Sequence, residues 1–282
     1  MSDTDTLQRF VFEHADIRGE IVHLSASYQA IMQQHQYPPI IQRLLGEALL
    51  AVALLSASIK FKGQLTLQFS GDAPIKLLVA KCDDEMHIRG LAQFDENALP
   101  ADLEYAFYNG RLVVTIEQDD KVMPYQSIIP LNGRSITSGL ELYFAQSEQI
   151  PTRIWLTTDH GVAAGMLLQL LPGLDSEERE RFWEHAVKIG ETITDIELKQ
   201  LDNLTILHRL YHEEDLRLFD PSPVIFRCHC SRDKMLQAVR LLGETEANDI
   251  LKHNKEIVVN CEYCNREYAF DKVDIATLFV RH

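Results

Sequence analysis

The strongest pattern in the chain is a long apolar run over residues 40–58. Its leucines, alanines and valines fall on most faces of a helix rather than on one stripe, which is typical of a helix buried in a core. Tyr37, Pro38 and Pro39 come just before it, and proline suits the first turn of a helix. A shorter helical segment covers residues 27–34. The pattern therefore predicts a central core helix that begins at a proline turn.

After this helix the pattern changes to the alternation of strands. Leu65, Leu67 and Phe69 alternate with polar residues, as in a strand with one buried face. A turn at Gly71-Asp72 follows, and further short segments are separated by turn residues. They are the predicted strands 75–80, 86–92, 112–117, 127–131, 153–157 and 166–170 and a helix at 139–146. Together these elements predict an α+β domain with an antiparallel sheet over residues 1–174.

A helical but acidic segment, residues 175–223, follows this domain. From residue 175 to 220 it holds thirteen acidic residues against six basic ones. An apolar stripe recurs at three-residue spacing: Leu198, Leu201, Leu204, Leu207 and Leu210. One interpretation is an ordinary amphipathic helical hairpin. The other is a marginally stable linker, because a short stripe beside many like charges buries little surface.

The charge of the chain argues against polyanionic partners. The formal net charge is −15 and the sequence pI is about 5.1, whereas a protein that holds nucleic acid through phosphates normally has a basic balance. The same charge disfavours anionic lipid and helps keep a protein dispersed. The sequence therefore predicts neither a nucleic-acid nor a membrane partner.

Nothing near the first residues resembles a targeting segment. Asp3 and Asp5 stand where a signal peptide has lysine or arginine, and the apolar run at 48–57 is shorter than the roughly 20 residues of a membrane span. The expected location is the cytoplasm, where thiols stay reduced. No phosphate-binding loop, nucleophile elbow or catalytic triad pattern is present, so the sequence gives no positive case for an enzyme.

Four of the five cysteines gather in the last quarter of the chain. Cys228 and Cys230 are separated by one residue, and Cys261 and Cys264 by two. Two such pairs can complete a tetrahedral shell of soft ligands around zinc. The intervening residues predict a compact unit over 224–282, with Ser231 as an N-cap, a helix at 235–242 and a hairpin of strands 257–260 and 268–270. Metal binding would supply most of the stability of so small a unit.

The role of the predicted zinc site stays open from the residues alone. A purely structural zinc ribbon is one interpretation. A redox switch is the other, because a disulfide across the single residue His229 would close almost no loop and would be labile. Thiolates held without protons are also reactive toward oxidants.

The remaining candidate side chains are weaker. His229 or His253 could replace a cysteine as a ligand, although four cysteines suffice. Cys82 is expected to be a half-buried thiol without a partner, and His208 and His212 are expected on a solvated helix face.

Three classes of function are compatible with this chemistry. A switchable protein controlled by the thiols is the first, and a zinc-ribbon protein that binds nucleic acid or a transcription complex is the second. A thiol oxidoreductase is the third, because Cys-x-x-Cys can be catalytic. The missing basic patch counts against the second class, and the absence of a βαβ pattern before Cys261 counts against the third.

Several segments resemble one known family, the redox-regulated holdase chaperones called heat-shock protein 33. They are the segments 45–50 (LGEALL), 63–68 (GQLTLQ), 143–152 (YFAQSEQIPT), 168–173 (LQLLPG) and 226–231 (FRCHCS), with CEYC at 261–264. The resemblance spans nearly the whole chain, and the paired cysteine spacing makes it specific.

The resemblance implies an activity that composition does not. A reduced form with one zinc per chain would be inactive, and hypochlorite, or peroxide combined with heat, would form disulfides Cys228–Cys230 and Cys261–Cys264 and release the metal. The zinc unit and the linker would then unfold and expose a surface that holds unfolding client proteins without ATP. The resemblance also implies an oxidised homodimer and transfer of clients to ATP-dependent foldases.

Overall fold

The computed structural model describes residues 5–71, 74–99, 109–131, 134–159, 161–173 and 177–280. The chain divides into two compact units, Met1–Phe226 and Arg227–His282. Asp72 of the predicted turn and the first two residues of the predicted linker, 175 and 176, lie outside the described residues.

The first unit contains two six-stranded sheets. In the first, called sheet A, the strands follow the order β10-β1-β2-β9-β8, and β11 also pairs with β1. All of its pairs are antiparallel. Its strands are β1 (Thr6–Phe12), β2 (Ile17–Leu24), β8 (Thr152–Asp159), β9 (Val162–Leu170), β10 (Leu216–Leu218) and β11 (Ser222–Pro223).

The second sheet, sheet B, has the order β12-β5-β4-β3-β6-β7. Only the short strand β12 runs parallel to its neighbour among the described pairs of this sheet. Its strands are β3 (Gly63–Ser70), β4 (Ile75–Asp83), β5 (His87–Phe94), β6 (Arg111–Gln118), β7 (Tyr125–Pro130) and β12 (Ile225–Phe226).

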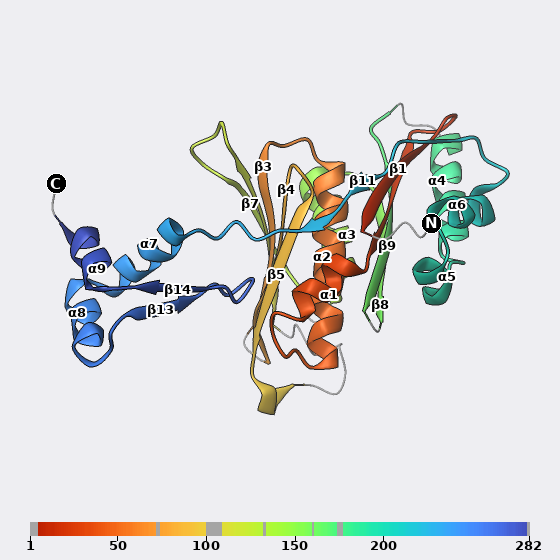
Figure 1. The fold of residues 1–282 in the computed structure, drawn as a ribbon. Coiled ribbons are helices and arrows are strands. Elements are labelled where there is room, and N and C mark those ends of the chain that lie inside the picture. The colour runs from red at the N-terminus through yellow and green to blue at the C-terminus, as the bar shows by residue number, and fades with distance from the viewer. Residues whose placement is uncertain are drawn as a thin grey trace. The chain divides into compact units, whose positions relative to one another are not determined.

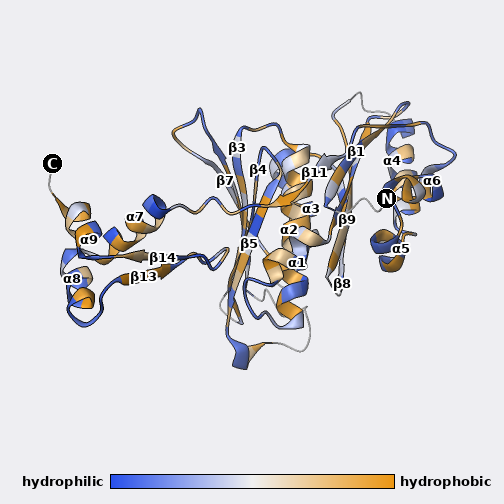
Figure 2. Ribbon diagram, viewed as in Figure 1, coloured by the Kyte–Doolittle hydropathy of each residue, from blue (hydrophilic) through white to orange (hydrophobic). Residues whose placement is uncertain are grey.

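Helix α2 (Pro39–Ser58) lies between the two sheets (Figure 1) and packs against strands of both. It is apolar along most of its length (Figure 2), and every residue from Leu44 to Ser56 is buried. Packing is close, because a Cβ at Gly90 of β5 would lie 2.9 Å from Leu45 Cδ1 of the helix. The predicted core helix and its proline start are confirmed.

By length and composition alone α2 is the one described helix that could cross a membrane. However, 78% of its apolar window is buried inside the protein. The apolar composition of α2 is therefore explained by its position in the core of the first unit.

Shorter helices flank the sheets. They are α1 (Ala26–Met32), a 3-10 turn (Glu96–Ala98), and α3 (Ile136–Tyr143), which runs into a π-helical turn at Phe144–Glu148. Ser135 caps α3 by accepting a hydrogen bond from the Ser138 N–H. Gln149 ends the π turn in the left-handed region at φ 56°.

Helices α4 (Glu177–Gly190), α5 (Asp195–Gln200) and α6 (Asn203–Tyr211) lie on the side of sheet A away from α2 (Figure 1). Their apolar side chains and those of sheet A form a second core. Phe12 of β1 meets the Tyr211 ring edge-on at 5.1 Å, and the Tyr211 hydroxyl donates to Ala186 O. After α6 the chain turns back and adds β10 and β11 to the edge of sheet A.

A buried polar cluster lies where β2 meets the end of α2. Arg18 donates to Ser58 O at 2.8 Å and to the Gln169 amide oxygen, and Ser58 Oγ donates to one oxygen of Glu20. The other Glu20 oxygen has no hydrogen-bond partner among the described residues. Burial raises the pKa of Glu20 to about 8, although Arg18 and Arg9 act against this shift.

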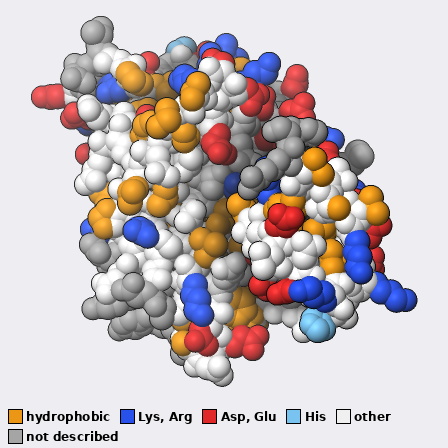
Figure 3. All heavy atoms as spheres, turned by 90° about the vertical axis from the view of Figure 1, so that its left-hand side faces the viewer, with side chains coloured by type: hydrophobic (Ala, Val, Ile, Leu, Met, Phe, Trp, Pro, Cys, Tyr) orange, Lys and Arg blue, Asp and Glu red, His pale blue; other side chains and the backbone are white. Residues whose placement is uncertain are grey.

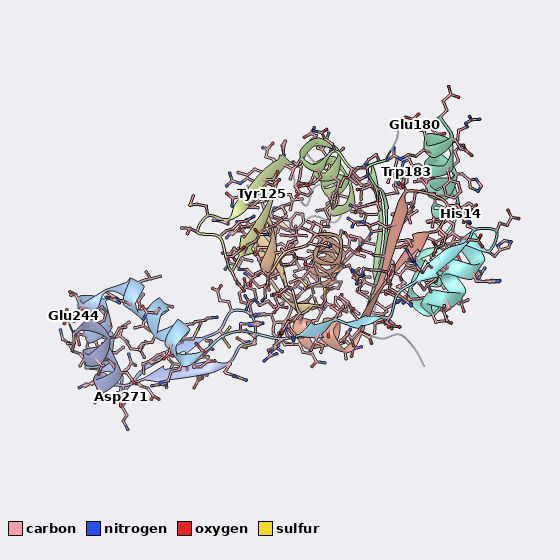
Figure 4. The ribbon with its side chains drawn as sticks, turned by 90° about the horizontal axis from the view of Figure 1, so that it is seen from above. His14, Tyr125, Glu180, Trp183, Glu244 and Asp271 are labelled. Atoms are coloured by element: carbon pink, nitrogen blue, oxygen red, sulfur yellow. The ribbon has the colours of Figure 1, made fainter. Side chains whose placement is uncertain are left out.

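The described part of the second unit contains three helices and one hairpin. They are α7 (Arg232–Leu242), α8 (Glu244–His253), α9 (Lys272–Phe279), β13 (Ile257–Asn260) and β14 (Glu267–Phe270). Figure 4 labels Glu244 and Asp271, at the starts of α8 and α9. In the described part of this unit, six buried apolar residues form one core cluster: Val239, Ala247, Leu251, Ile257, Phe270 and Ile275.

Several local expectations were wrong. The strand β1 and the helix α9 were not predicted, and the strands divide into two sheets rather than one. The acidic segment is not helical to residue 220, because Leu216–Leu218 form β10. The leucine stripe spans two helices, α5 and α6, and Leu204 is 63% exposed.

Candidate metal centre

Two separate parts of the second unit carry the four clustered cysteines. Cys228 and Cys230 lie in the irregular segment before α7, and Cys261 and Cys264 lie in the turn between β13 and β14. Ser231 ends the first segment as predicted, since its hydroxyl accepts the Lys234 N–H and starts α7.

The turn after β13 is fixed by its own backbone. The Cys261 N–H donates to Arg266 O at 2.9 Å, and the Asn265 N–H donates to Cys261 O at 2.8 Å. Asn265 has φ 53°, a left-handed conformation that asparagine tolerates better than most residues. This turn brings Cys264 back toward Cys261, as expected of a metal knuckle.

The four sulfur atoms converge on one point. All lie within 4.8 Å of one another, with separations of 3.6 Å for Cys228–Cys261 and 3.5 Å for Cys230–Cys264. The thiols are free. Zinc with Zn–S bonds of about 2.3 Å gives a tetrahedron whose sulfur–sulfur edges are about 3.8 Å. The donor set and its spacing therefore fit a tetrahedral thiophilic metal ion.

The electrostatics of the thiols favour a bound cation. Burial raises the pKa of Cys228, and burial likewise raises the pKa of Cys264. Burial also acts to raise the pKa of Cys230, but the Tyr268 hydroxyl, which donates to its sulfur at 3.2 Å, and the neighbouring thiols lower it to about 7. Four thiolates so close together repel each other, and a divalent cation would offset that charge.

Arg232 joins the cysteine segments to the rest of the unit. Its guanidinium donates to Ala269 O at 2.8 Å, pairs with Asp274 at 2.6 Å and lies over the Phe270 ring. Lys234 Nζ donates to His229 O at 2.9 Å. These contacts tie the start of α7 to the hairpin and to α9, and so position both cysteine pairs.

The other candidate side chains are not part of this group. Neither His229 nor His253 belongs to the four-sulfur group found among the described residues. Cys82 lies in β4 of the first unit and is fully buried, not half-buried as predicted. Burial raises the pKa of the Cys82 thiol to about 12, so it is an unreactive core thiol. His208 and His212 are exposed on α6 and at its end, as expected.

The sequence reasoning missed Tyr268 and Arg232. Tyr268 lies opposite Val259 in the hairpin, and this register carries its hydroxyl to Cys230. The sequence signal for a role of Tyr268 was weak, because aromatic residues are common in strands.

The structure defines an α+β protein with a small C-terminal unit in which four cysteines lie close enough together to hold a metal ion. A family model described as "Hsp33 protein" matches residues 5–271. The chain belongs to the Hsp33 family.

Named relatives and a solved structure agree with this assignment. The chain is 43% identical to the "33 kDa chaperonin" of Nitrosococcus oceani over 99% of its length and 96% of that protein. It is 44% identical to the protein of the same name from Azotobacter vinelandii, with the same coverage. The crystal structure of the 33 kDa chaperonin from Thermotoga maritima matches with a TM-score of 0.84 at 26% identity, over 97% of each chain. These matches confirm the family resemblance and the α+β fold class.

Proposed function

We propose that this protein is a redox-regulated, ATP-independent holdase that keeps unfolding proteins from aggregating. Membership of the Hsp33 family supports a chaperone role. The proposed redox regulation is supported by the convergence of four thiols in a unit whose core cluster has six buried apolar residues. Most of the stability of such a unit would come from its metal.

Zinc is the proposed metal, one ion per chain in the reduced state. Cys228, Cys230, Cys261 and Cys264 would be its four ligands, and zinc would supply charge neutralisation and tetrahedral cross-linking of the two cysteine segments. Four sulfur donors favour zinc over magnesium or calcium, which take oxygen ligands.

Oxidation of the four thiolates would remove every ligand. Two hypochlorous acid molecules take four electrons from four thiolates, giving two disulfides, two chlorides and two hydroxides. Two peroxide molecules would give the same two disulfides and four hydroxides. The family resemblance favours the pairs Cys228–Cys230 and Cys261–Cys264, each of which closes a very short loop and constrains the unit little.

Loss of the metal would then destabilise the helices of the linker, which precedes the cysteines in the chain. We propose a core domain at 1–174, a metastable linker at 175–223 and a switch domain at 224–282. The linker helices pack against sheet A through the second core, in which Leu198, Leu207 and Tyr211 are buried. Their release would expose the apolar outer side of this sheet to clients, while the net charge of −15 keeps the complex dispersed.

The same proposal includes the remaining partners and location. The oxidised protein would form a homodimer in the cytoplasm and would pass clients to ATP-dependent foldases once reducing conditions return. Nothing in this scheme requires an enzyme active site, nucleic acid or a membrane.

One experiment tests the proposal. Aggregation of a thermally unfolding client is followed by light scattering with reduced and with hypochlorite-treated protein, while a chromophoric chelator follows zinc release. We expect suppression only by the oxidised form, with release of one zinc per chain. Zinc that survives hypochlorite, together with unchanged client aggregation, would refute the switch.

A further inference from the structure

Two exposed histidines lie next to each other at the end of α6. His208 belongs to the last turn of the helix, and His212 follows its final residue with helical backbone angles of φ −65° and ψ −17°. Positions four residues apart lie on the same face of a helix. The centroids of the two rings are 5.9 Å apart, and the ring planes are tilted by 34°. Both side chains are exposed.

Two other histidines near this end of α6 already contact carboxylates. His185 Nε2 lies 3.7 Å from Glu214, and His14 Nε2 lies 3.2 Å from Asp215. Figure 4 labels His14, in the turn between β1 and β2.

The rings of His208 and His212 contact each other instead. Neither ring has a hydrogen bond or an ion pair within the described part of the chain. Elsewhere on the surface, as on the face drawn in Figure 3, a histidine (pale blue) stands singly among charged side chains. The ring nitrogens of the α6 pair can therefore be shared by one ligand.

The spacing of this pair suits a single metal ion. Two histidines four residues apart on a helix can bind one zinc ion through their ring nitrogens. With Zn–N bonds of about 2 Å and a tetrahedral angle, the ring centroids would be about 5 Å apart. From the observed 5.9 Å the rings need to approach by about 1 Å, which rotation of exposed side chains allows.

The charges at this end of α6 favour a cation. The last carbonyl groups of a helix carry partial negative charge, which attracts positive charge to its C-terminus. Three acidic residues, 213–215, follow His212 directly. Arg209 is the nearest cation in sequence, but Glu197 offsets its charge at a distance of 2.7 Å.

We propose that His208 and His212 bind a divalent transition-metal ion, of which zinc is the example tested, at a site separate from the four cysteines. Imidazole nitrogen suits zinc, copper and nickel, whereas magnesium and calcium take oxygen ligands. Water would fill the positions that two histidines leave open, so this ion would be held less tightly than one bound by four thiolates.

The ion would stabilise α6. It bridges the two rings only while the last turn is helical, and a ligand that binds only the folded form of a segment favours that form. Because α6 is released in the proposed switch, the bound ion would favour the inactive form of the protein. This consequence rests on the proposed function, whereas the metal site itself does not.

The test titrates zinc chloride into the full-length reduced protein, already loaded with one zinc per chain, and follows binding by calorimetry. We expect the parent to bind a second zinc. His208→Gln should weaken this second zinc at least ten-fold, since loss of a ligand costs no less than loss of a group that only orients one. His185→Gln, whose ring already contacts a carboxylate, should bind it like the parent.

A variant of unchanged composition tests the spacing. His212→Glu combined with Glu213→His keeps two histidines and the net charge, but it places them five residues apart and so on different faces of the helix. We expect this exchange variant to lose the second zinc. In the parent, zinc should also slow exchange of the α6 amides and leave the α2 amides unchanged, and in the exchange variant it should slow neither.

The absence of a second zinc in the parent, or equal binding by the exchange variant, overturns the inference. Binding without slower exchange in α6 would place the second zinc elsewhere and also overturn it. Neither readout uses a client protein. Failure here with intact oxidant-dependent suppression of aggregation therefore leaves the proposed function standing, and loss of that suppression with an intact second zinc leaves the site standing.

Discussion

At the scale of single residues, Tyr268 is a polar side chain in direct contact with the four-cysteine cluster. Its hydroxyl donates a hydrogen bond to Cys230 Sγ at 3.2 Å. Groups that bond to metal ligands orient them and tune their affinity, and their loss typically weakens binding 10–100-fold. This bond connects β14 to the cysteine segment before α7, so it also contributes to the position of the ligand.

We predict that Tyr268→Phe weakens zinc binding by roughly 10-fold, because the Cys230 thiolate loses its hydroxyl donor. Competition with a chelator of known affinity measures the change. Tyr125→Phe, the same substitution in the first unit, is the matched control and should bind zinc like the parent. Identical affinities for both variants would show that the hydroxyl does not influence the metal.

Glu20 allows a second prediction at this scale. Burial raises its pKa from the ordinary 4.5 to about 8, so between these values the folded protein holds a proton that the unfolded chain has lost. Its contribution to stability is complete below pH 4.5 and disappears as the pH rises through 8. From pH 5 to pH 8 the parent should lose roughly 2–4 kcal/mol through this group.

Urea unfolding of Glu20→Gln tests this contribution. Both tryptophans, Trp155 and Trp183, lie in the first unit, so their fluorescence reports on its unfolding. The variant should lose less stability than the parent between pH 5 and pH 8. Glu178→Gln, at an exposed position of α4, should follow the parent. The same loss in Glu20→Gln as in the parent would contradict the assignment.

These residues show which parts of a site sequence can reveal. The convergence of the four cysteines could be predicted because metal-ligand spacing is local, with two short pairs that each lie in one turn. Tyr268 and Arg232 were missed, because their contacts depend on the register of a hairpin and on where α9 packs. Glu20 lies between Gly19 and Ile21 in β2, but it is buried beside Ser58 of α2, which is remote in sequence.

At the scale of elements, the helices α5 and α6 pack against sheet A through the second core, and in the proposed switch they would be released. Leu207 of α6 is 3% exposed in the second core, whereas Leu204 on the same helix is 63% exposed. A substitution at Leu207 therefore tests the packing of α6 in the second core, whereas the same substitution at Leu204 tests the intrinsic helix propensity of α6.

We predict that Leu207→Ala makes the protein easier to activate. Removal of a buried leucine side chain costs about 2–5 kcal/mol, so the linker helices should separate from sheet A more readily. With peroxide present, suppression of client aggregation should begin roughly 5–10 °C lower than in the parent. Leu204→Ala should activate at the parent's temperature. If both variants behave like the parent, release of α6 is not part of activation.

The elements themselves were predictable where their pattern is long. The helix α2 was found because its apolar run is long, and most strands of sheet B were found because short segments of strand residues are separated by turn residues. Strand β10 is only three residues long and exists because it pairs with β1, which no local pattern encodes. The division into two sheets also escaped prediction, because strands facing α2 from either side have the same alternation.

At the scale of the whole molecule, the segment that precedes the second unit pairs with both sheets of the first unit. Before Arg227, β11 pairs with β1 and β12 pairs with β5. Ser27 Oγ donates to Val224 O and accepts the Phe226 N–H. The end of the first unit at Phe226 is therefore held by contacts within that unit.

The two units should consequently respond differently to loss of the metal. We predict that Cys261→Ser, under reducing conditions, binds zinc far more weakly, because a serine hydroxyl is a poor ligand in place of a thiolate. Its second unit should then exchange amide hydrogens rapidly throughout α7, α8, α9 and the hairpin, since a core cluster of six apolar residues cannot compensate for a lost metal. Amides of α2 should stay protected, because that helix is buried between two sheets.

Cys82→Ala, which removes a thiol outside the four-cysteine cluster, should keep one zinc per chain and a protected second unit. If Cys261→Ser keeps its second unit as protected as the parent, the apolar core alone holds that unit together, and oxidation of the thiols could not unfold it.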